Sequence, residues 1–127
     1  LIADNNILAI GILRRQLEYF HMDVKPCFSW EQTQTVLEDT FFFLDLCFIQ
    51  IDILTDEEIK TLLKLKQKRN ISLVFIVNNK KSEAYEKAIN IEDTYVLTKP
   101  YTQDTLLELL GEIDSQKKPI KSTLNIQ

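Results

Sequence analysis

The sequence predicts an α/β domain in which a five-stranded parallel sheet is covered by helices on both faces. Two near-continuous apolar runs, DLCFIQI (45–51) and SLVFIV (72–77), have the length and composition of strands that are buried on both sides. Stretches with apolar residues at helical spacing alternate with strand-like stretches along the whole chain. Strands that alternate with helices form parallel sheets with right-handed crossovers.

Composition and charge exclude several functions. The 127 residues, 45% of them hydrophobic and 27% charged, fit one globular domain. The net charge of -4 argues against nucleic acid as a partner, and no apolar run is long enough to span a bilayer, so we expect no direct membrane contact. The two cysteines, Cys27 and Cys47, lie in apolar runs and are expected to be reduced core thiols of a cytoplasmic protein. Because the chain opens on a strand-like segment without an initiator methionine, we expect it to be part of a longer protein.

The first strand and helix are predicted at the N-terminus. Leu1–Ala3 is apolar and runs into the polar triplet DNN (4–6), which can turn the chain and cap a helix. The helix is predicted from Asn6 to Phe20, with a buried stripe at Ile10, Leu13, Leu17 and Phe20.

The second strand is predicted at the edge of the sheet. MDVKPCF (22–28) is extended in character, and Pro26 removes a backbone donor that an inner strand would need. Ser29 is predicted to cap a helix over Trp30–Glu38.

The remaining elements follow the strand at 45–51. Thr55 and Glu58 form a capping box for a helix that ends near Arg69. After the strand at 72–77 we predict a helix at 80–90, a strand at 94–98 and a helix from Asp104 to about Ile113. The polar segment 115–127, which contains Pro119, is predicted to be a linker or tail, leaving 1–114 as the folded domain.

With an edge-like second strand, the strand order 2-1-3-4-5 of flavodoxin-like three-layer sandwiches is expected. Functional sites in such sheets lie at the carboxyl ends of the strands. The residues predicted to meet there are Asp4, Asn5, Gln50, Val77 and Lys99.

The motifs LIADNN, DLCFIQI, SLVFIVNN and YVLTKP, in this order, resemble the receiver domain of two-component response regulators. The resemblance implies an acidic Mg²⁺-binding pair after the first strand and a phosphorylated aspartate ending the third. It also implies a Thr or Ser ending the fourth strand and a Lys-Pro pair ending the fifth. Asp4, Lys99 and Pro100 match these positions.

Four positions depart from that pattern. Asn5 replaces the second acid, Gln50 the acceptor aspartate, Val77 the hydroxyl residue, and Val96 the aromatic residue three positions before the lysine. The amide of Gln50 is neutral and cannot form an acyl phosphate, and the loss of carboxylates predicts weak or absent Mg²⁺ binding. We therefore expect a degenerate pseudo-receiver without cofactor or catalytic activity, in which Lys99 pairs with Asp4 and meets the Gln50 carbonyl.

Two other aspartates remain open as acceptors. Asp45 follows the apolar run FFFL, but choosing it would turn LCFIQIDIL into a buried loop. Asp52 lies two residues after Gln50 and on the same face of an extended strand. Phosphorylation on Asp52 or Asp45 is therefore the alternative to a phosphorylation-independent domain.

The expected function is that of a protein-interaction module. The first helix carries a second stripe opposite its core face, and this stripe is the candidate interface: Leu8, Ile12, Arg15 and Tyr19. The partners implied by the resemblance are domains of a hybrid sensor histidine kinase or an adjacent receiver. The expected location is cytoplasmic, including the cytoplasmic part of a membrane-anchored kinase; a stand-alone atypical regulator is the alternative. A flavodoxin-like cofactor binder is disfavoured, because the turn ADNN has no phosphate cradle.

Overall fold

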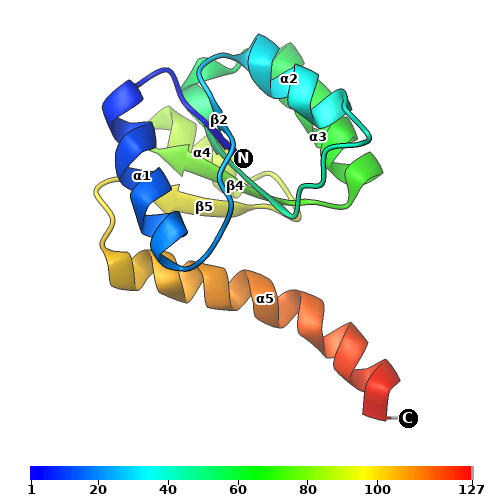
Figure 1. Ribbon diagram of the computed structural model, residues 1–127. Coiled ribbons are helices and arrows are strands. Elements are labelled where there is room, and N and C mark those ends of the chain that lie inside the picture. Colours follow the sequence, from blue (N-terminus) through cyan, green and yellow to red (C-terminus); the bar gives the residue numbers. More distant parts are fainter. Residues whose placement is uncertain (127) are drawn as a thin grey trace.

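Five parallel strands form one sheet in the order β2-β1-β3-β4-β5 (Figure 1). The computed structural model describes the backbone of residues 1–126 and the side chains of residues 1–115. The predicted flavodoxin-like topology is thereby confirmed, including the edge position of the second strand. The strands are β1 (Ile2–Ala3), β2 (Pro26–Cys27), β3 (Leu46–Gln50), β4 (Ser72–Val77) and β5 (Tyr95–Thr98).

The helices follow the strands in alternation, as predicted. A short 3₁₀ helix, η1 (Ile51–Ile53), separates β3 from the helix after it. None of the helices in the described part of the chain is long and apolar enough to cross a membrane. The α-helices are α1 (Ile7–Tyr19), α2 (Trp30–Glu38), α3 (Asp56–Arg69), α4 (Glu83–Ile89) and α5 (Gln103–Ile126).

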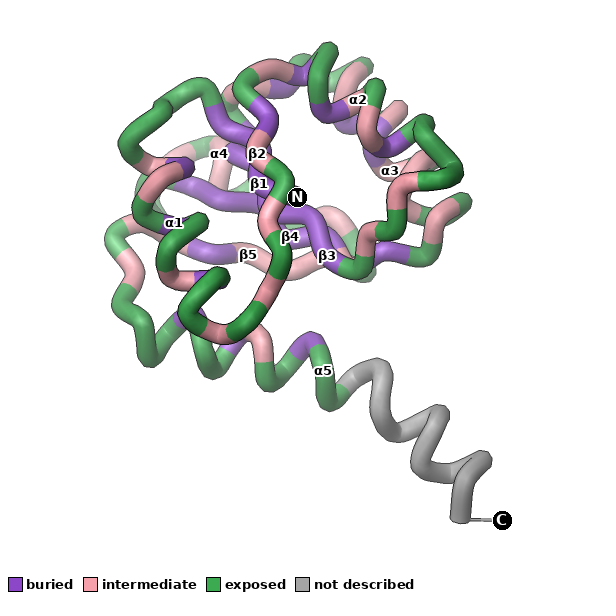
Figure 2. Tube along the Cα trace, viewed as in Figure 1, coloured by how far each residue is buried: buried purple, intermediate pink, exposed green. Residues whose placement is uncertain are grey.

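Two hydrophobic clusters lie on opposite faces of the sheet, whose inner strands β1, β3 and β4 are buried along most of their length (Figure 2). One cluster, called here the α1–α5 core, joins alternate strand residues such as Ile2 and Phe48 to Leu13 of α1 and Leu106 of α5. The other includes Trp30 of α2, residues of α3 and Ala88 of α4, together with the remaining strand residues. Both cysteines are buried and free, in agreement with their prediction as core thiols.

Side-chain caps fix the starts of three helices where the sequence predicted them. Asn6 Oδ1 accepts a hydrogen bond from the amide of Ala9, and Ser29 Oγ accepts one from Gln32. Thr55 and Glu58 form the reciprocal capping box, in which each side chain accepts from the other's backbone amide. Because these bonds satisfy amides that a helix leaves free at its first turn, they set the direction in which the chain leaves the sheet.

Two helix boundaries differ from the prediction. Helix α4 begins at Glu83 rather than residue 80, because Ser82 Oγ caps the amide of Tyr85. Helix α5 does not end near Ile113 but continues to Ile126, through most of the segment predicted to be a polar linker. The prediction gave too much weight to Pro119 as a helix breaker; Gln127 lies outside the described residues. The division into a domain and a tail stays a prediction.

Candidate functional site

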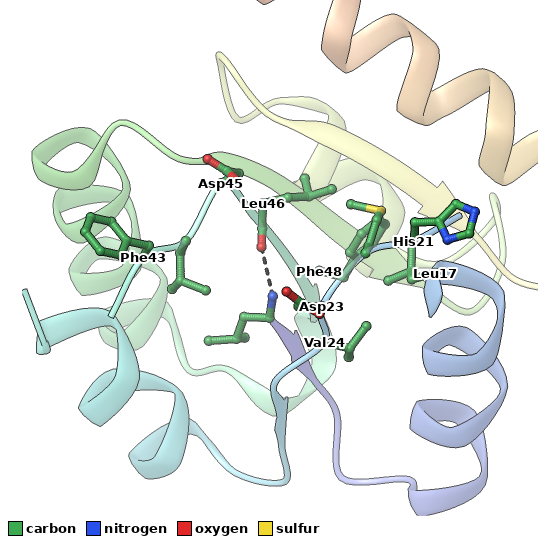
Figure 3. Close-up of a pocket in the computed structure, with 11 residues that line it drawn as sticks. Leu17, His21, Asp23, Val24, Phe43, Asp45, Leu46 and Phe48 are labelled. Carbon is green, nitrogen blue, oxygen red and sulfur yellow. Dashed lines mark hydrogen bonds between the residues drawn. The ribbon is translucent and has the colours of Figure 1, made fainter. Parts of the chain in front are cut away.

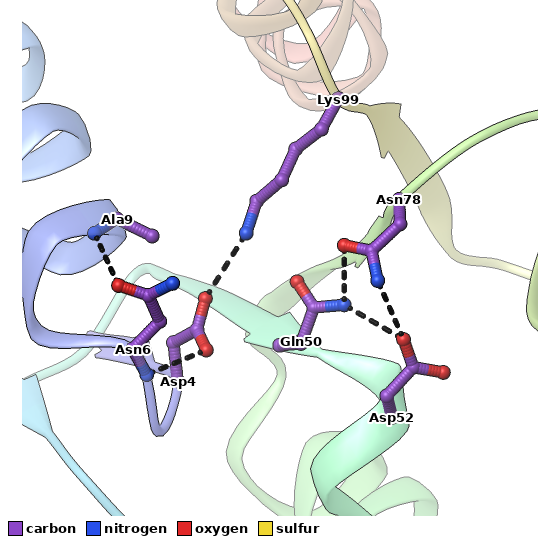
Figure 4. Close-up of polar contacts among 7 residues, drawn as sticks. All are labelled: Asp4, Asn6, Ala9, Gln50, Asp52, Asn78 and Lys99. Atoms are coloured by element: carbon purple, nitrogen blue, oxygen red, sulfur yellow. Dashed lines mark hydrogen bonds and ion pairs between the residues drawn. The ribbon is translucent and has the colours of Figure 1, made fainter.

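Four strands each direct one polar side chain to the carboxyl edge of the sheet. Each of these residues comes two positions after an apolar residue of the α1–α5 core, and residues two apart in an extended chain point to the same side. Together they line a pocket of about 160 Å³ (Figure 4). The pairs are Ile2 and Asp4, Phe48 and Gln50, Ile76 and Asn78, and Leu97 and Lys99.

Asp4 and Lys99 form an ion pair across this pocket. Asp4 Oδ2 lies 3.3 Å from Lys99 Nζ, and Asp4 Oδ1 accepts a hydrogen bond of 3.0 Å from the amide of Asn6. The Asp4 side chain is only 4% exposed, whereas that of Lys99 is 27% exposed. A buried carboxylate needs such partners, so the predicted pairing of Lys99 with Asp4 is confirmed. Lys99 precedes Pro100 through a cis peptide bond.

Gln50 ends β3 and joins a triangle of polar side chains. Its Nε2 donates to Asp52 Oδ2 at 3.1 Å and to Asn78 Oδ1 at 3.3 Å. Asn78 Nδ2 also donates to Asp52 Oδ2, at 3.2 Å, which closes the triangle. Gln50 Oε1 is buried and accepts no hydrogen bond among the described residues, so the predicted contact of this carbonyl with Lys99 is not made.

Asn78, which the sequence analysis did not select, occupies the place that was predicted for Val77. Val77 is fully buried and belongs to the core cluster on the opposite face, with Phe75. The two-residue alternation from Ile76 places the next side chain, Asn78, in the pocket instead. The prediction chose the last apolar residue of the strand, although the alternation could have identified Asn78.

The other predicted residues are distributed over both edges of the sheet. Asn5 is exposed and lines the rim of the pocket, as does Asp52, which lies in η1. Asp45 is exposed and precedes the first residue of β3, so it lies at the amino edge, where it lines a separate pocket. The structure therefore brings Asp52 close to Gln50 and places Asp45 at the other end of the strand.

Tyr101, which follows Pro100, lies close enough to the pocket for the Asp4 carboxylate to affect its pKa. Burial, and then the negative charge of Asp4, raise the pKa of Tyr101 to about 12. The phenol is thus a neutral hydrogen-bonding group at physiological pH.

The oxygen atoms at this edge do not fit a Mg²⁺ site. Mg²⁺ needs carboxylate and water oxygens in octahedral arrangement. Asp4 Oδ2 instead faces the ammonium of Lys99, and Asp52 Oδ2 accepts two amide N–H groups. No group of three or more His, Cys, Asp or Glu side chains in the described part of the chain could hold a metal ion. Weak or absent Mg²⁺ binding stays a prediction.

The candidate interface on α1 is exposed, as predicted. Leu8, Ile12 and Tyr19 are 79%, 57% and 71% exposed, and Arg15 lies on the same open surface. Leu8 and Ile12 also line a shallow pocket of about 370 Å³ together with Gln16 and Tyr101. Their contact with a partner stays a prediction.

The sequence matches no protein-family model and no curated protein, but the fold has clear neighbours among solved structures. The response regulator receiver domain protein (CheY-like) from Methanospirillum hungatei JF-1 superposes with a TM-score of 0.75 at 20% identity, over 93% of this chain and 94% of that one. The N-terminal domain of a response regulator/sensory box/GGDEF 3-domain protein from Carboxydothermus hydrogenoformans gives 0.77 at 14% identity, over 93% and 94%.

A third neighbour is a larger protein. NtrX from Brucella abortus, in complex with ATP, has a TM-score of 0.77 at 15% identity, with 99% of this chain covering 29% of that one. At these identities the likeness concerns the fold. The chain has the CheY-like fold of response regulator receiver domains.

Proposed function

We propose that this chain is a receiver domain of two-component signalling that works without phosphorylation at the end of its third strand. The single observation that supports this most directly is Gln50. It ends β3 inside the pocket, 4% exposed, where the resemblance requires an aspartate. Its amide nitrogen is neutral and engaged with Asp52 and Asn78, so it offers no nucleophilic lone pair to phosphorus.

The expected mode of action is contact between folded domains. The Asp4–Lys99 pair joins the ends of β1 and β5, and the Gln50–Asn78–Asp52 triangle joins the ends of β3 and β4, in both cases through side chains of this chain alone. Such a connection favours one arrangement of the carboxyl edge and needs no ligand to maintain it. We propose that neighbouring domains of a hybrid sensor histidine kinase, or an adjacent receiver, bind this fixed surface and the exposed face of α1.

A second candidate is phosphorylation on Asp52. This carboxylate is exposed and lines the same pocket as Lys99. Asp45 is less favoured, because it lies at the opposite edge of the sheet from the ammonium of Lys99.

Intact-mass measurement after incubation with acetyl phosphate and Mg²⁺ tests the proposal. The wild-type chain should gain no phosphoryl group, while the Gln50→Asp variant should gain one, since it restores a carboxylate in the pocket that Lys99 also lines. Wild-type labelling that disappears in Asp52→Asn would contradict the proposal and support the second candidate. Labelling lost only in Asp45→Asn would assign the acceptor to the other edge.

A further inference from the structure

The shallow pocket of about 370 Å³, called here the α1 pocket, lies between α1 and the loop that joins β5 to α5. Leu8, Ala9 and Ile12 line it from α1, and Pro100 and Tyr101 line it from the loop. Small-molecule sites usually have volumes of about 300 to 1,000 Å³, mostly apolar walls and a few polar groups. At roughly 30 Å³ for each water-sized group, the α1 pocket has room for about ten non-hydrogen atoms.

The apolar walls of the α1 pocket remain partly open to water. Leu8 and Ile12, which lie one helical turn apart on α1, keep more than half of their surface exposed. Tyr101 adds an aromatic ring from the loop. A flat ring that covers these side chains removes apolar surface from water, which favours binding.

The lining of the α1 pocket carries little uncompensated charge. Its one charged residue among the described side chains is Lys99, and the ammonium of Lys99 lies 3.3 Å from Asp4 Oδ2. The pocket at the amino edge of the sheet differs, because carboxylates line it and the ammonium of Leu1 donates to the Leu46 carbonyl there at 2.9 Å (Figure 3). The α1 pocket therefore suits an uncharged ligand.

Gln16 adds an amide whose oxygen has no hydrogen-bond donor. It follows Leu8 and Ile12 at four-residue spacing on α1, so it lies on the same face of the helix, and it lines the α1 pocket. Gln16 Oε1 is shielded from solvent and accepts no hydrogen bond among the described residues. A buried acceptor without a donor is costly, and a ligand that supplies the donor recovers this cost. The terminal torsion of a glutamine is broad, so the amide can turn toward such a ligand.

We infer that the α1 pocket binds an uncharged aromatic lactam or a similar heterocycle, in which an N–H donor stands next to an acceptor. A primary amide has its donor and its acceptor side by side, so this ligand donates to Gln16 Oε1 and accepts from Gln16 Nε2. Its ring covers Leu8 and Ile12 and packs against Tyr101. A bound ligand competes with any domain that docks on these two residues of α1. Gln50 does not line the α1 pocket, so this inference does not depend on the absence of phosphorylation.

Amide NMR of the ¹⁵N-labelled chain can test the inference with 2-quinolone, an uncharged bicyclic lactam. We expect it to shift the resonances of residues 6–16 and 99–102 and of the Gln16 side-chain amide. N-methyl-2-quinolone, which lacks the N–H donor, should bind about tenfold more weakly, because one hydrogen bond is lost. The anion quinoline-2-carboxylate should also bind more weakly than 2-quinolone.

Several outcomes of this titration would overturn the inference. They are the absence of shifts with 2-quinolone, shifts confined to other surfaces, equal binding of the N-methyl compound, and tighter binding of the carboxylate. Shifts of the same resonances that grow with protein concentration alone would assign the α1 pocket to a second copy of the chain, and would overturn the inference as well.

Substitutions separate the contact with the amide from the contact with the ring. Gln16→Met keeps the length of the side chain but removes both hydrogen-bonding groups, so it should bind 2-quinolone and N-methyl-2-quinolone with equal affinity. The matched control Gln67→Met, at an exposed position of α3, should keep the tenfold difference. Ile12→Ser, at a position that is 57% exposed, should fold normally and should weaken the binding of both compounds alike. A tenfold difference that persists in Gln16→Met, or unchanged binding in Ile12→Ser, contradicts the assignment.

Discussion

The Lys99 ammonium lies 3.3 Å from Oδ2 of Asp4, so an ion pair joins the ends of β1 and β5, which are not neighbours in the sheet. β3 and β4 lie between these two strands, and their polar ends, Gln50 and Asn78, are bonded to each other. The carboxyl edge is therefore connected by side chains across the sheet as well as by the backbone ladder along it.

Removing the cation should destabilise the fold. Lys99→Met leaves the Asp4 carboxylate, which is 4% exposed, without its charged partner. We expect the free energy of unfolding to fall by about 2 kcal/mol, less than for a fully buried pair because Lys99 is partly solvated. Denaturant unfolding measures the change. The Asp4→Asn/Lys99→Met double variant should recover part of the loss, and a single variant as stable as wild type would contradict the pairing.

Ionisation of Cys47 should make the protein sensitive to high pH. Complete burial raises the pKa of its thiol from 9.0 to about 12. Because the folded pKa is the higher one, the thiol's contribution to stability is fully present below 9.0 and is lost as the pH rises toward 12. Urea unfolding across this range should show a loss of stability that is reduced in Cys47→Ala. A slope identical to wild type would contradict the assignment.

Asp56 should titrate at unusually low pH. The hydrogen bond and charge of Lys87 lower the pKa of its carboxyl below the ordinary 3.8. Because the pKa of this carboxyl is lower in the folded than in the unfolded protein, its contribution to stability is present above pH 3.8. The contribution is lost as the pH falls through the pKa of the folded protein. Carboxyl ¹³C NMR should place the midpoint near 3.8 in Lys87→Met, whereas Lys60→Met should change it less. An unchanged midpoint in Lys87→Met would refute the link.

The Arg69 guanidinium donates hydrogen bonds to backbone carbonyls at the end of α2 and in the loop between α2 and β3, and these bonds should stabilise both segments. Arg69→Lys keeps the charge but cannot supply the same set of donors, so we expect a loss of about 2 kcal/mol in the free energy of unfolding. Amide hydrogen exchange at residues 36–43 should accelerate. The neighbouring Lys68→Gln is the control, since Lys68 is exposed, and exchange that is equally slow in Arg69→Lys would show that the loop does not need these bonds.

The fold was predictable because local signals and burial agree. The apolar runs ending at Gln50 and Val77 indicate inner strands, since strands that are covered on both faces are apolar at successive positions. Asn6, Ser29 and Thr55 marked helix starts, and Pro26 marked the sheet edge. Short-range signals of this kind can be recognised in a single sequence.

The site was predicted less completely than the fold. Asp4, Gln50 and Lys99 were identified because each ends or directly follows a strand, but Asn78 was missed by one position. The register of strand pairing decides to which side of the sheet the last residues of a strand point, and the pairing of β4 with β5 ends at Val77 and Thr98. Apolar character alone does not show where this pairing ends. The long α5 was missed because its second half is polar, so no buried stripe indicates where the helix ends.

The second strand limits how this sheet can be extended. β2 is two residues long, and one of them is Pro26, which has no amide hydrogen to donate. An incoming strand would find few partners on that side, which protects the domain from edge-to-edge aggregation. Any strand added by another chain is therefore expected along β5, at the opposite margin of the sheet.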